Sequence, residues 1–233
     1  MSALAGRVAV VFGATGWIGS AVCRDVLAAG ARLVVVGRDA GRLDGLEREL
    51  GGGDRVLTVV ADVTSQLEVD DARAAAIARF GHIDLVVVSS GVITASAFDE
   101  GVPADWAEMI DVNLRGLLHA AQTFAEPLAH AAARSGYADL VLIGAVSTDV
   151  RAPRLAVFNA LSSAIKELAR TLRHEFGPRG LRVHLVEPGF GADESRDAAT
   201  LRPEAIASTV TLGAALPAGA NLAEVTILPT RTA

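Results

Sequence analysis

The sequence predicts an α/β fold, a doubly wound parallel sheet of about seven strands flanked by helices on both faces. Three observations support this prediction. Short runs rich in β-branched residues alternate with longer, Ala-rich amphipathic segments, which is the pattern of repeated βαβ units. Hydrophobic residues make up 51% of the chain and aromatic residues only 4%, so small and branched aliphatic side chains must fill the core. A glycine-rich turn joins the first strand to the first helix.

Seven short apolar runs are expected to form the strands. Each is rich in Val, Leu or Ile, and a glycine-containing or polar segment separates it from the next helix. The expected strands are Arg7–Phe12, Arg32–Gly37, Val56–Ala61, Leu85–Ser89, Leu140–Ala145, Arg182–Val186 and Glu224–Leu228.

Six amphipathic segments between these strands are expected to be helices. They are Trp17–Ala29, Gly41–Leu50, Gln66–Phe80, Ala104–Ser135, Pro153–Phe176 and Arg202–Leu216. Pro127 is expected to kink or break the long fourth helix near its end, because proline cannot donate the hydrogen bond of a helix interior. Four glycines lie where helices should stop, at Gly30, Gly81, Gly136 and Gly177. No Pro/Ser-rich linker, repeat or block of charge interrupts the pattern, so residues 1–233 are predicted to form a single domain.

The charge and composition argue against several classes of partner. A formal net charge of −6 gives no reason to expect nucleic acid or an acidic membrane. No run approaches the roughly 18–20 apolar residues that a membrane span needs. The start of the chain shows no basic region followed by a cleavage site, so a cytoplasmic location is expected. No cluster has metal-ligand spacing, so no metal is expected, and the predicted ligand is a small-molecule substrate.

The turn Gly13–Gly19 has the sequence expected of a dinucleotide site. A glycine-rich turn lets backbone N–H groups approach a pyrophosphate at the start of a helix, where the helix dipole also favours an anion. This turn follows the first strand and opens the first βαβ unit, which is the context the motif requires. It therefore predicts a Rossmann fold, with cofactor contacts from Gly13, Thr15, Gly16, Trp17, Ile18 and Gly19.

Arg38, directly after the second strand, bears on which cofactor is bound. An acidic residue near this point usually bonds the ribose 2′-hydroxyl of NAD, whereas an arginine suits the 2′-phosphate of NADP. Arg38 therefore favours NADP(H) over NAD(H), and a solvated arginine at the start of a loop is the alternative.

Further landmarks along the chain resemble the short-chain dehydrogenase/reductase family from end to end. They follow the turn in the family's order: Asp62-Val63, Ser89-Ser90-Gly91, Asn113, Pro188-Gly189 and the closing strand Val225–Thr230. The resemblance implies that Asp62 and Val63 hold the adenine, that Gly91 passes beside the cofactor, and that Pro188 and Gly189 meet the nicotinamide. Asp62 as a cap of the following helix and Pro188-Gly189 as an ordinary turn are the alternatives. The family also pairs its fourth and fifth helices between subunits, which implies a homodimer or homotetramer.

The same resemblance implies that this chain lacks the catalytic residues of the family. Its reductases use a Ser at the end of one strand, a Tyr on the next helix, and a Lys four residues after the Tyr. These positions are occupied by Ala145, Phe158 and Ser162. The only tyrosine, Tyr137, precedes the strand, and the only lysine, Lys166, lies two turns beyond Phe158, so neither restores the motif.

The missing side chains matter because reducing a ketone leaves an alkoxide that must be protonated. A phenol donates that proton well when a nearby ammonium lowers its pKa. Such help is worth about 10²–10⁴ in rate. Phe158 has no proton to give, so ketone reduction by the family mechanism is not expected. Asn113, Ser147 and Asp149 are the remaining candidates for catalysis; for the last two, loop and turn residues are the alternative.

Three functions remain open at this stage. The first is a nonstandard oxidoreductase that binds NADP(H) and transfers a hydride to an activated carbon, such as an iminium, that needs no proton donor. The second is a non-redox enzyme on the same fold, such as a cyclase, dehydratase or isomerase. The third is a noncatalytic nucleotide-binding partner, because a fold does not settle function.

Overall fold

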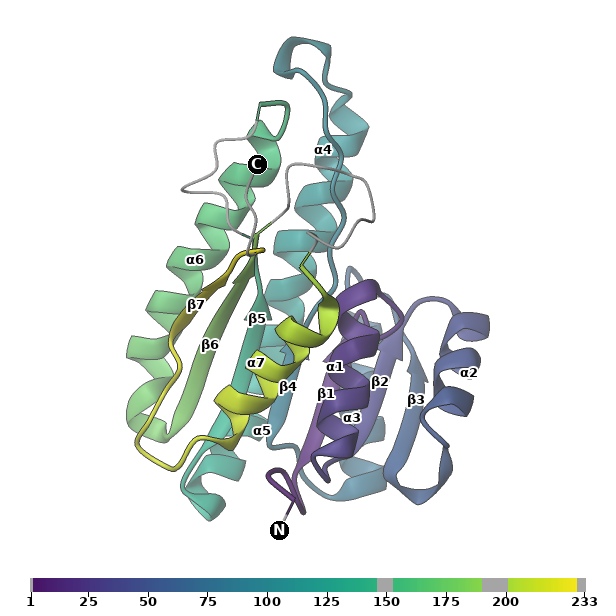
Figure 1. Ribbon diagram of the computed structural model, residues 1–233, viewed down its shortest axis with the longest axis vertical. Coiled ribbons are helices and arrows are strands. Elements are labelled where there is room, and N and C mark those ends of the chain that lie inside the picture. The colour runs from purple at the N-terminus through teal and green to yellow at the C-terminus, as the bar shows by residue number, and fades with distance from the viewer. Residues whose placement is uncertain (1, 146–152, 190–200, 230–233) are drawn as a thin grey trace.

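The computed structural model describes residues 2–145, 153–189 and 201–229. Their centre is one sheet of seven parallel strands in the order β3-β2-β1-β4-β5-β6-β7 (Figure 1). The order reverses between β1 and β4, which is where doubly wound folds bind their ligands. The strands are Val8–Phe12 (β1), Arg32–Gly37 (β2), Val56–Val60 (β3), Leu85–Val88 (β4), Ala138–Ile143 (β5), Leu181–Pro188 (β6) and Glu224–Ile227 (β7). The predicted fold class is confirmed.

The central strands are buried on both faces, which explains their unbroken apolar sequences. Val10 of β1 pairs with Val34 of β2 on one side and with Val86 of β4 on the other. All three side chains are fully buried. A strand covered on both faces has no solvent side on which a polar residue could alternate, so valine runs are favoured.

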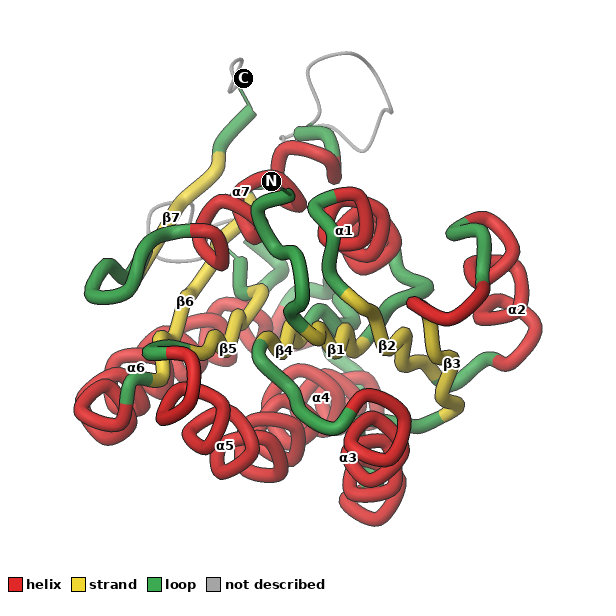
Figure 2. The backbone as a smooth tube through the Cα atoms, turned by 90° about the horizontal axis from the view of Figure 1, so that it is seen from below, coloured by secondary structure: helices red, strands yellow, loops and turns green. Residues whose placement is uncertain are grey.

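Helices cover the two faces in separate layers, as Figure 2 shows. One layer contains Trp17–Ala28 (α1), Ala40–Glu49 (α2) and Pro203–Ala215 (α7). The other contains Gln66–Phe80 (α3), Pro103–Ile110 (α4), Gly116–Ser135 (α5) and Ala156–Phe176 (α6). Short 3₁₀ turns lie at Gly53–Arg55 (η1), Phe98–Glu100 (η2) and Gly177–Arg179 (η4). No helix among the described residues is both long and apolar enough to cross a membrane.

The predicted fourth helix differs from the observed one at its interruption. The segment from α4 to α5 is broken by a π-helical turn at Asp111–Arg115 (η3), and α5 then continues through Pro127 to Ser135. Pro127 was expected to kink or break the helix, and the break is not observed. A π turn inserts one extra residue into the helical ladder, and such turns occur frequently at functional sites. Asn113 lies inside this turn.

The glycines predicted to end helices behave as expected at three of four positions. Gly30, Gly81 and Gly136 all have positive φ, with Gly81 and Gly136 as the left-handed C-caps of α3 and α5. Gly177 differs, because its φ of −54° lets the chain continue into η4. Gly180, with a φ of 80°, makes the left-handed turn instead.

Candidate functional site

The turn between β1 and α1 is packed so closely that only glycine fits at two of its positions. Gly13 has a φ of 69°, and a Cβ there would lie 2.7 Å from the backbone nitrogen of Ser90. A Cβ on Gly19 would lie 2.1 Å from the carbonyl oxygen of Gly13. Gly16 forms the N-cap of α1, and no side chain hydrogen-bonds to the first turn of that helix. The turn therefore presents a helix N-terminus at the carboxyl end of the sheet, which suits an anionic phosphate.

The other residues of the turn divide between surface and core. Trp17 begins α1 and is 56% exposed, whereas Ile18 packs against the core beneath that helix. The carbonyl oxygen of Thr15 accepts a hydrogen bond from the guanidinium of Arg42, at the start of α2. The sequence analysis missed Arg42. The sequence did hold a signal for Arg42. Asp39 is a typical helix-capping residue, and Arg42 stands three residues after it, in the first turn of the helix that follows Arg38.

Arg38 and Asp62 lie at the ends of the neighbouring strands β2 and β3. Arg38 is exposed. One carboxylate oxygen of Asp62 accepts hydrogen bonds of 2.8 Å from both the backbone nitrogen and the hydroxyl of Thr64. Burial alone would raise the pKa of Asp62, but these hydrogen bonds and the charge of Arg38 outweigh it and lower the pKa. Asp62 is not the helix cap, because Ser65 fills that role for α3.

Val63 follows Asp62 and packs tightly against the start of α5. A Cβ on Gly116 would lie 2.6 Å from a methyl carbon of Val63, so glycine permits this approach. His119, one turn further along α5, has its Nδ1 3.1 Å from the carbonyl oxygen of Val63. These contacts hold the segment after β3 beside the carboxyl end of the sheet.

Asn113 fixes the loop that follows β4. Its side-chain oxygen accepts a hydrogen bond from the nitrogen of Val92, and its amide group donates one to the carbonyl oxygen of the same residue, both at 2.8 Å. Asn113 is 7% exposed. Its amide therefore holds the backbone directly after Gly91, which places it as a positioning residue for the loop. Ser89, at the start of this loop, has a buried hydroxyl oxygen with no hydrogen-bond partner among the described residues.

Pro188 and Gly189 end β6 at the same edge of the sheet. The nitrogen of Gly189 donates a 2.8 Å hydrogen bond to the carbonyl oxygen of Ile227 in β7. A Cβ on Gly189 would lie 2.5 Å from a methyl carbon of Leu228. This close approach, and the pairing of Pro188 with Ile227, fix where the chain leaves the sheet.

An apolar cluster lies between the end of β5, α4 and the first two turns of α6. Its buried members are Met109, Ala145, Phe158 and Leu161. Val92, Trp106 and Leu155 are among the partly buried side chains packed against them. Ser162 is also buried, and its hydroxyl donates a 3.0 Å hydrogen bond to the carbonyl oxygen of Phe158 in its own helix. That hydroxyl is therefore engaged by the backbone.

These features together fit a dinucleotide. The first turn of α1 has no side-chain cap, because the N-cap residue is Gly16. The buried hydroxyl of Ser89 lacks a partner beside this turn. Unpartnered polar groups that meet at the switch point of a parallel sheet are the donors and acceptors such a ligand needs.

Comparison with known proteins identifies the family. The short chain dehydrogenase family matches residues 7–200. The chain belongs to the short-chain dehydrogenase/reductase family. A protein of Staphylococcus epidermidis described as an uncharacterized oxidoreductase is 33% identical, over 96% of this chain and 97% of that protein. A similarly described protein of Staphylococcus aureus is 30% identical, over 98% of this chain and all of that one.

Solved structures share the fold of this short-chain dehydrogenase/reductase. The 3-ketoacyl-(acyl-carrier-protein) reductase from Brucella melitensis, complexed with NADH, has a TM-score of 0.88 at 22% identity. A metagenomic short-chain oxidoreductase in complex with NADP has a TM-score of 0.85 at 26% identity. Each comparison covers 99% of this chain and 100% of the other. The first likeness shows the fold alone, because its sequence identity is low.

The two remaining predicted site residues of this short-chain dehydrogenase/reductase, Ser147 and Asp149, lie outside the described residues. Lys166, the only lysine of the chain, forms an ion pair of 3.0 Å with the buried carboxylate of Glu187. Glu224 of β7 lies 3.8 Å from the same ammonium group. The charge of Lys166 is thus balanced by carboxylates of β6 and β7.

Proposed function

We propose that this member of the family binds NADP(H) and transfers a hydride to or from an activated carbon, such as an iminium, rather than reducing ordinary ketones. One observation carries the proposal. Ala145 and Phe158, at the positions where the resemblance puts the family's catalytic Ser and Tyr, are members of one apolar cluster. Ser162, at the position of the Lys, bonds to the backbone of its own helix.

The cofactor would be held by the glycine-rich turn and the strand ends around it. The N-terminus of α1 would receive the pyrophosphate, and the loop held by Asn113 would pass beside the nicotinamide half. Arg38 would pair with the 2′-phosphate. A bound nicotinamide supplies or accepts the hydride.

The apolar wall formed by Met109, Phe158 and Leu161 determines which reactions this chain favours. Among the described residues, this wall offers no proton donor to a ketone oxygen held against it. An iminium carbon that accepts a hydride returns its π electrons to nitrogen and gives a neutral amine, so no proton is required. An apolar wall therefore hinders ketone reduction and permits iminium reduction.

The proposal is tested first by cofactor binding and then by turnover. Calorimetry is expected to show NADPH binding about tenfold tighter than NADH, and Arg38→Asp is expected to remove that preference. Arg48→Asp, an exchange on the outer side of α2, serves as the matched control. Undetectable binding of both cofactors would refute the cofactor assignment.

Turnover is then measured as NADPH oxidation with a cyclic imine and with the ketone of the same carbon skeleton. The proposal expects oxidation with the imine and little with the ketone. Turnover that needs no cofactor would place the protein among non-redox enzymes instead. Cofactor binding without turnover of either compound would favour a noncatalytic nucleotide-binding partner.

A further inference from the structure

A hollow opens next to the apolar cluster, at the carboxyl end of the sheet. It is shallow, and the space between its walls is about 200 Å³ with open solvent included. Its walls come from the loop after β4, from α4 and from the start of α6, and they include Thr94, Ser96, Trp106, Met109, Arg154 and Val157. Three of these residues, Trp106, Met109 and Val157, also belong to or pack against the cluster around Phe158. The hollow and the proposed reaction site thus share a wall.

Arg154, an exposed residue of this lining, has an unfavourable backbone conformation. Its φ of 72° is the only positive value outside glycine among the described residues. The carbonyl oxygen of Arg154 accepts a 2.9 Å hydrogen bond from the nitrogen of Ser96, which ties the start of α6 to the loop after β4. A side chain in the left-handed region persists only where its surroundings determine it, and such positions cluster at functional sites.

The charge of Arg154 is unbalanced within the part of the chain that the structure describes. No described carboxylate forms an ion pair with it, although Asp99 and Glu100 follow Phe98 in the same wall. No described residue hydrogen-bonds to the hydroxyl of Thr94 or of Ser96 either. One exposed cation and two partly exposed hydroxyls therefore line the hollow without a partner among the described residues, and donors of this kind recognise a carboxylate.

The rest of the hollow is apolar and aromatic. Phe98 and Trp106 stack with their ring centroids 5.5 Å apart and their planes 16° from parallel. Met109 is almost fully buried beneath them, and its flexible thioether adapts to varied apolar shapes. An apolar pocket with a few convergent polar groups is the usual form of a small-molecule site.

We propose that the substrate is a small carboxylic acid with an apolar or aromatic body. Its carboxylate pairs with the guanidinium of Arg154 and accepts hydrogen bonds from Thr94 and Ser96. Its body lies against Trp106 and Met109, which directs the far end of the molecule toward Phe158. This inference rests on the proposed function only for the identity of the reacting end, because the carboxylate site itself requires no cofactor.

The experiment measures binding directly, without cofactor, using phenylacetate and its neutral analogue phenylacetamide as probes. Each is titrated while the two tryptophan indole N–H signals are followed by NMR. Trp106 lines the hollow and Trp17 lies in the glycine-rich turn, so the second signal serves as an internal control. Phenylacetate is expected to shift the Trp106 signal and to bind about tenfold tighter than phenylacetamide.

Variants assign that preference to Arg154. Arg154→Gly removes the charge and also relieves the positive φ, so this variant is expected to fold and to bind both probes with affinities within about twofold. Arg154→Lys keeps the charge and is expected to retain a preference for phenylacetate. Arg134→Gln, at an exposed arginine near the end of α5, is the matched control and should bind as the wild type does.

Either of two affinity results would overturn the inference. One is an equal affinity of the wild type for both probes, and the other is a preference that survives in Arg154→Gly. A shift of the Trp17 signal in place of Trp106 would overturn it as well, since the acid would then bind elsewhere. Failure of NADPH to bind, or of the imine to react, would refute the proposed function and leave this result unaffected.

Discussion

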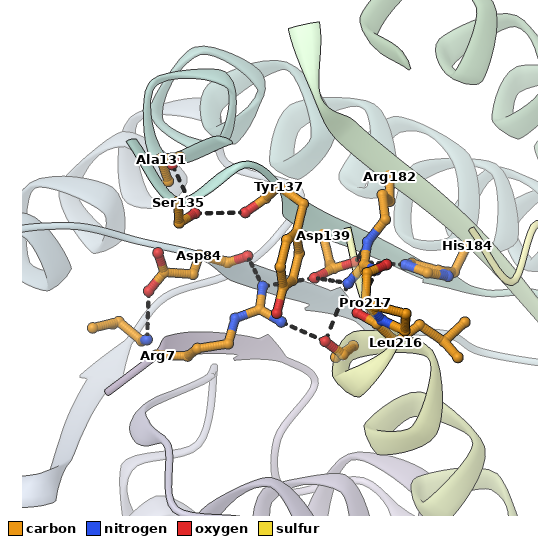
Figure 3. Close-up of polar contacts among 12 residues, drawn as sticks. Arg7, Asp84, Ala131, Ser135, Tyr137, Asp139, Arg182, His184, Leu216 and Pro217 are labelled. Carbon is orange, nitrogen blue, oxygen red and sulfur yellow. Dashed lines mark hydrogen bonds and ion pairs between the residues drawn. The ribbon is translucent and has the colours of Figure 1, made fainter. Parts of the chain in front are cut away.

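The amino and carboxyl ends of the parallel strands are built from different chemistry. At the amino ends, the fully buried carboxylate of Asp139 in β5 is bonded to two arginines and a histidine (Figure 3). Arg7 donates to it at 2.6 Å, Arg182 at 2.7 Å, and Nε2 of His184 lies 2.7 Å from it. Burial alone would raise the pKa of Asp139, but the hydrogen bonds of His184 and Arg182 and the charge of Arg7 lower it.

The same side chains tie the amino ends of the strands to the connection between α7 and β7. Arg182 donates to the carbonyl oxygens of Ala214 and Leu216 at the end of α7, and to that of Ala220 in the loop that follows. Its guanidinium carbon also lies 4.1 Å from the ring centroid of Tyr137. The charge of Arg182 is therefore bonded to several elements.

At the carboxyl ends, the side chains near the candidate site are mostly glycine or apolar. The turn Gly13–Gly19 and the cluster of Ala145 and Phe158 carry no charge. Replacing one of these residues leaves no buried charge unpaired, whereas removing Asp139 takes the counter-charge from both Arg7 and Arg182. The comparison indicates that stability depends most on the amino ends, and that reaction chemistry can change at the carboxyl ends without loss of the fold.

The largest expected effect comes from removing the shared acceptor. Asp139→Ala should lower the free energy of unfolding by about 3–5 kcal/mol, because buried cations lose their counter-charge. Urea unfolding measures the change, and Asp44→Ala on the exposed side of α2 is the control. A loss below about 1 kcal/mol would contradict the role given to this network.

The second prediction applies to the carboxyl end. Gly19→Val should weaken dinucleotide binding at least about a hundredfold, or about 2.7 kcal/mol, because its Cβ cannot fit beside the carbonyl of Gly13. Calorimetry measures the affinity. Gly45→Ala in α2, where a Cβ meets nothing within 4 Å, is the matched control and should bind normally. Unchanged binding in Gly19→Val would show that this turn does not hold the cofactor.

The third prediction sharpens the claim that chemistry at the carboxyl end can be changed. Ala145→Ser, Phe158→Tyr and Ser162→Lys, made together, should raise ketone reduction about a hundredfold above the wild type. Each single variant should show little gain, because such residues act as a unit. The assay is NADPH oxidation with a simple ketone. Efficient ketone reduction by the wild type would show that another group donates the proton, with Ser147 and Asp149 the first to examine.

The smallest expected effect is a dependence of stability on pH that belongs to the amino end. Since folding lowers the pKa of Asp139, its carboxylate stabilises the fold above the ordinary range near about 3.9, and this contribution disappears as the pH falls through the lowered value. The gap in unfolding free energy between the wild type and Asp139→Asn should therefore narrow by about 1 kcal/mol between pH 7 and acidic pH. Urea unfolding at both pH values measures it. A constant gap would show that Asp139 does not titrate with folding.

Local sequence alone determined the strands, most helix ends and the glycine-rich turn. The valine runs of β1, β2 and β4 and the position of Gly13–Gly19 between a strand and a helix follow from short-range periodicity and the conformational freedom of glycine. The fold class needed nothing more, because alternating strands and helices permit few topologies. The prediction that Ala145, Phe158 and Ser162 stand at the positions of the family's Ser, Tyr and Lys also came from local spacing, and it stays a prediction.

Only the tertiary structure decided which distant residues meet. Arg7, Asp139 and Arg182 are brought together by the strand order, and their one signal in the sequence is a charge placed within apolar runs such as Ala138–Ile143. The hollow at Arg154, the contact of Arg42 with the glycine-rich turn, and the π turn around Asn113 likewise depend on packing between elements. Local propensity sets each element, but the free energy of burying and pairing side chains acts across the sheet, and no short window of sequence contains it.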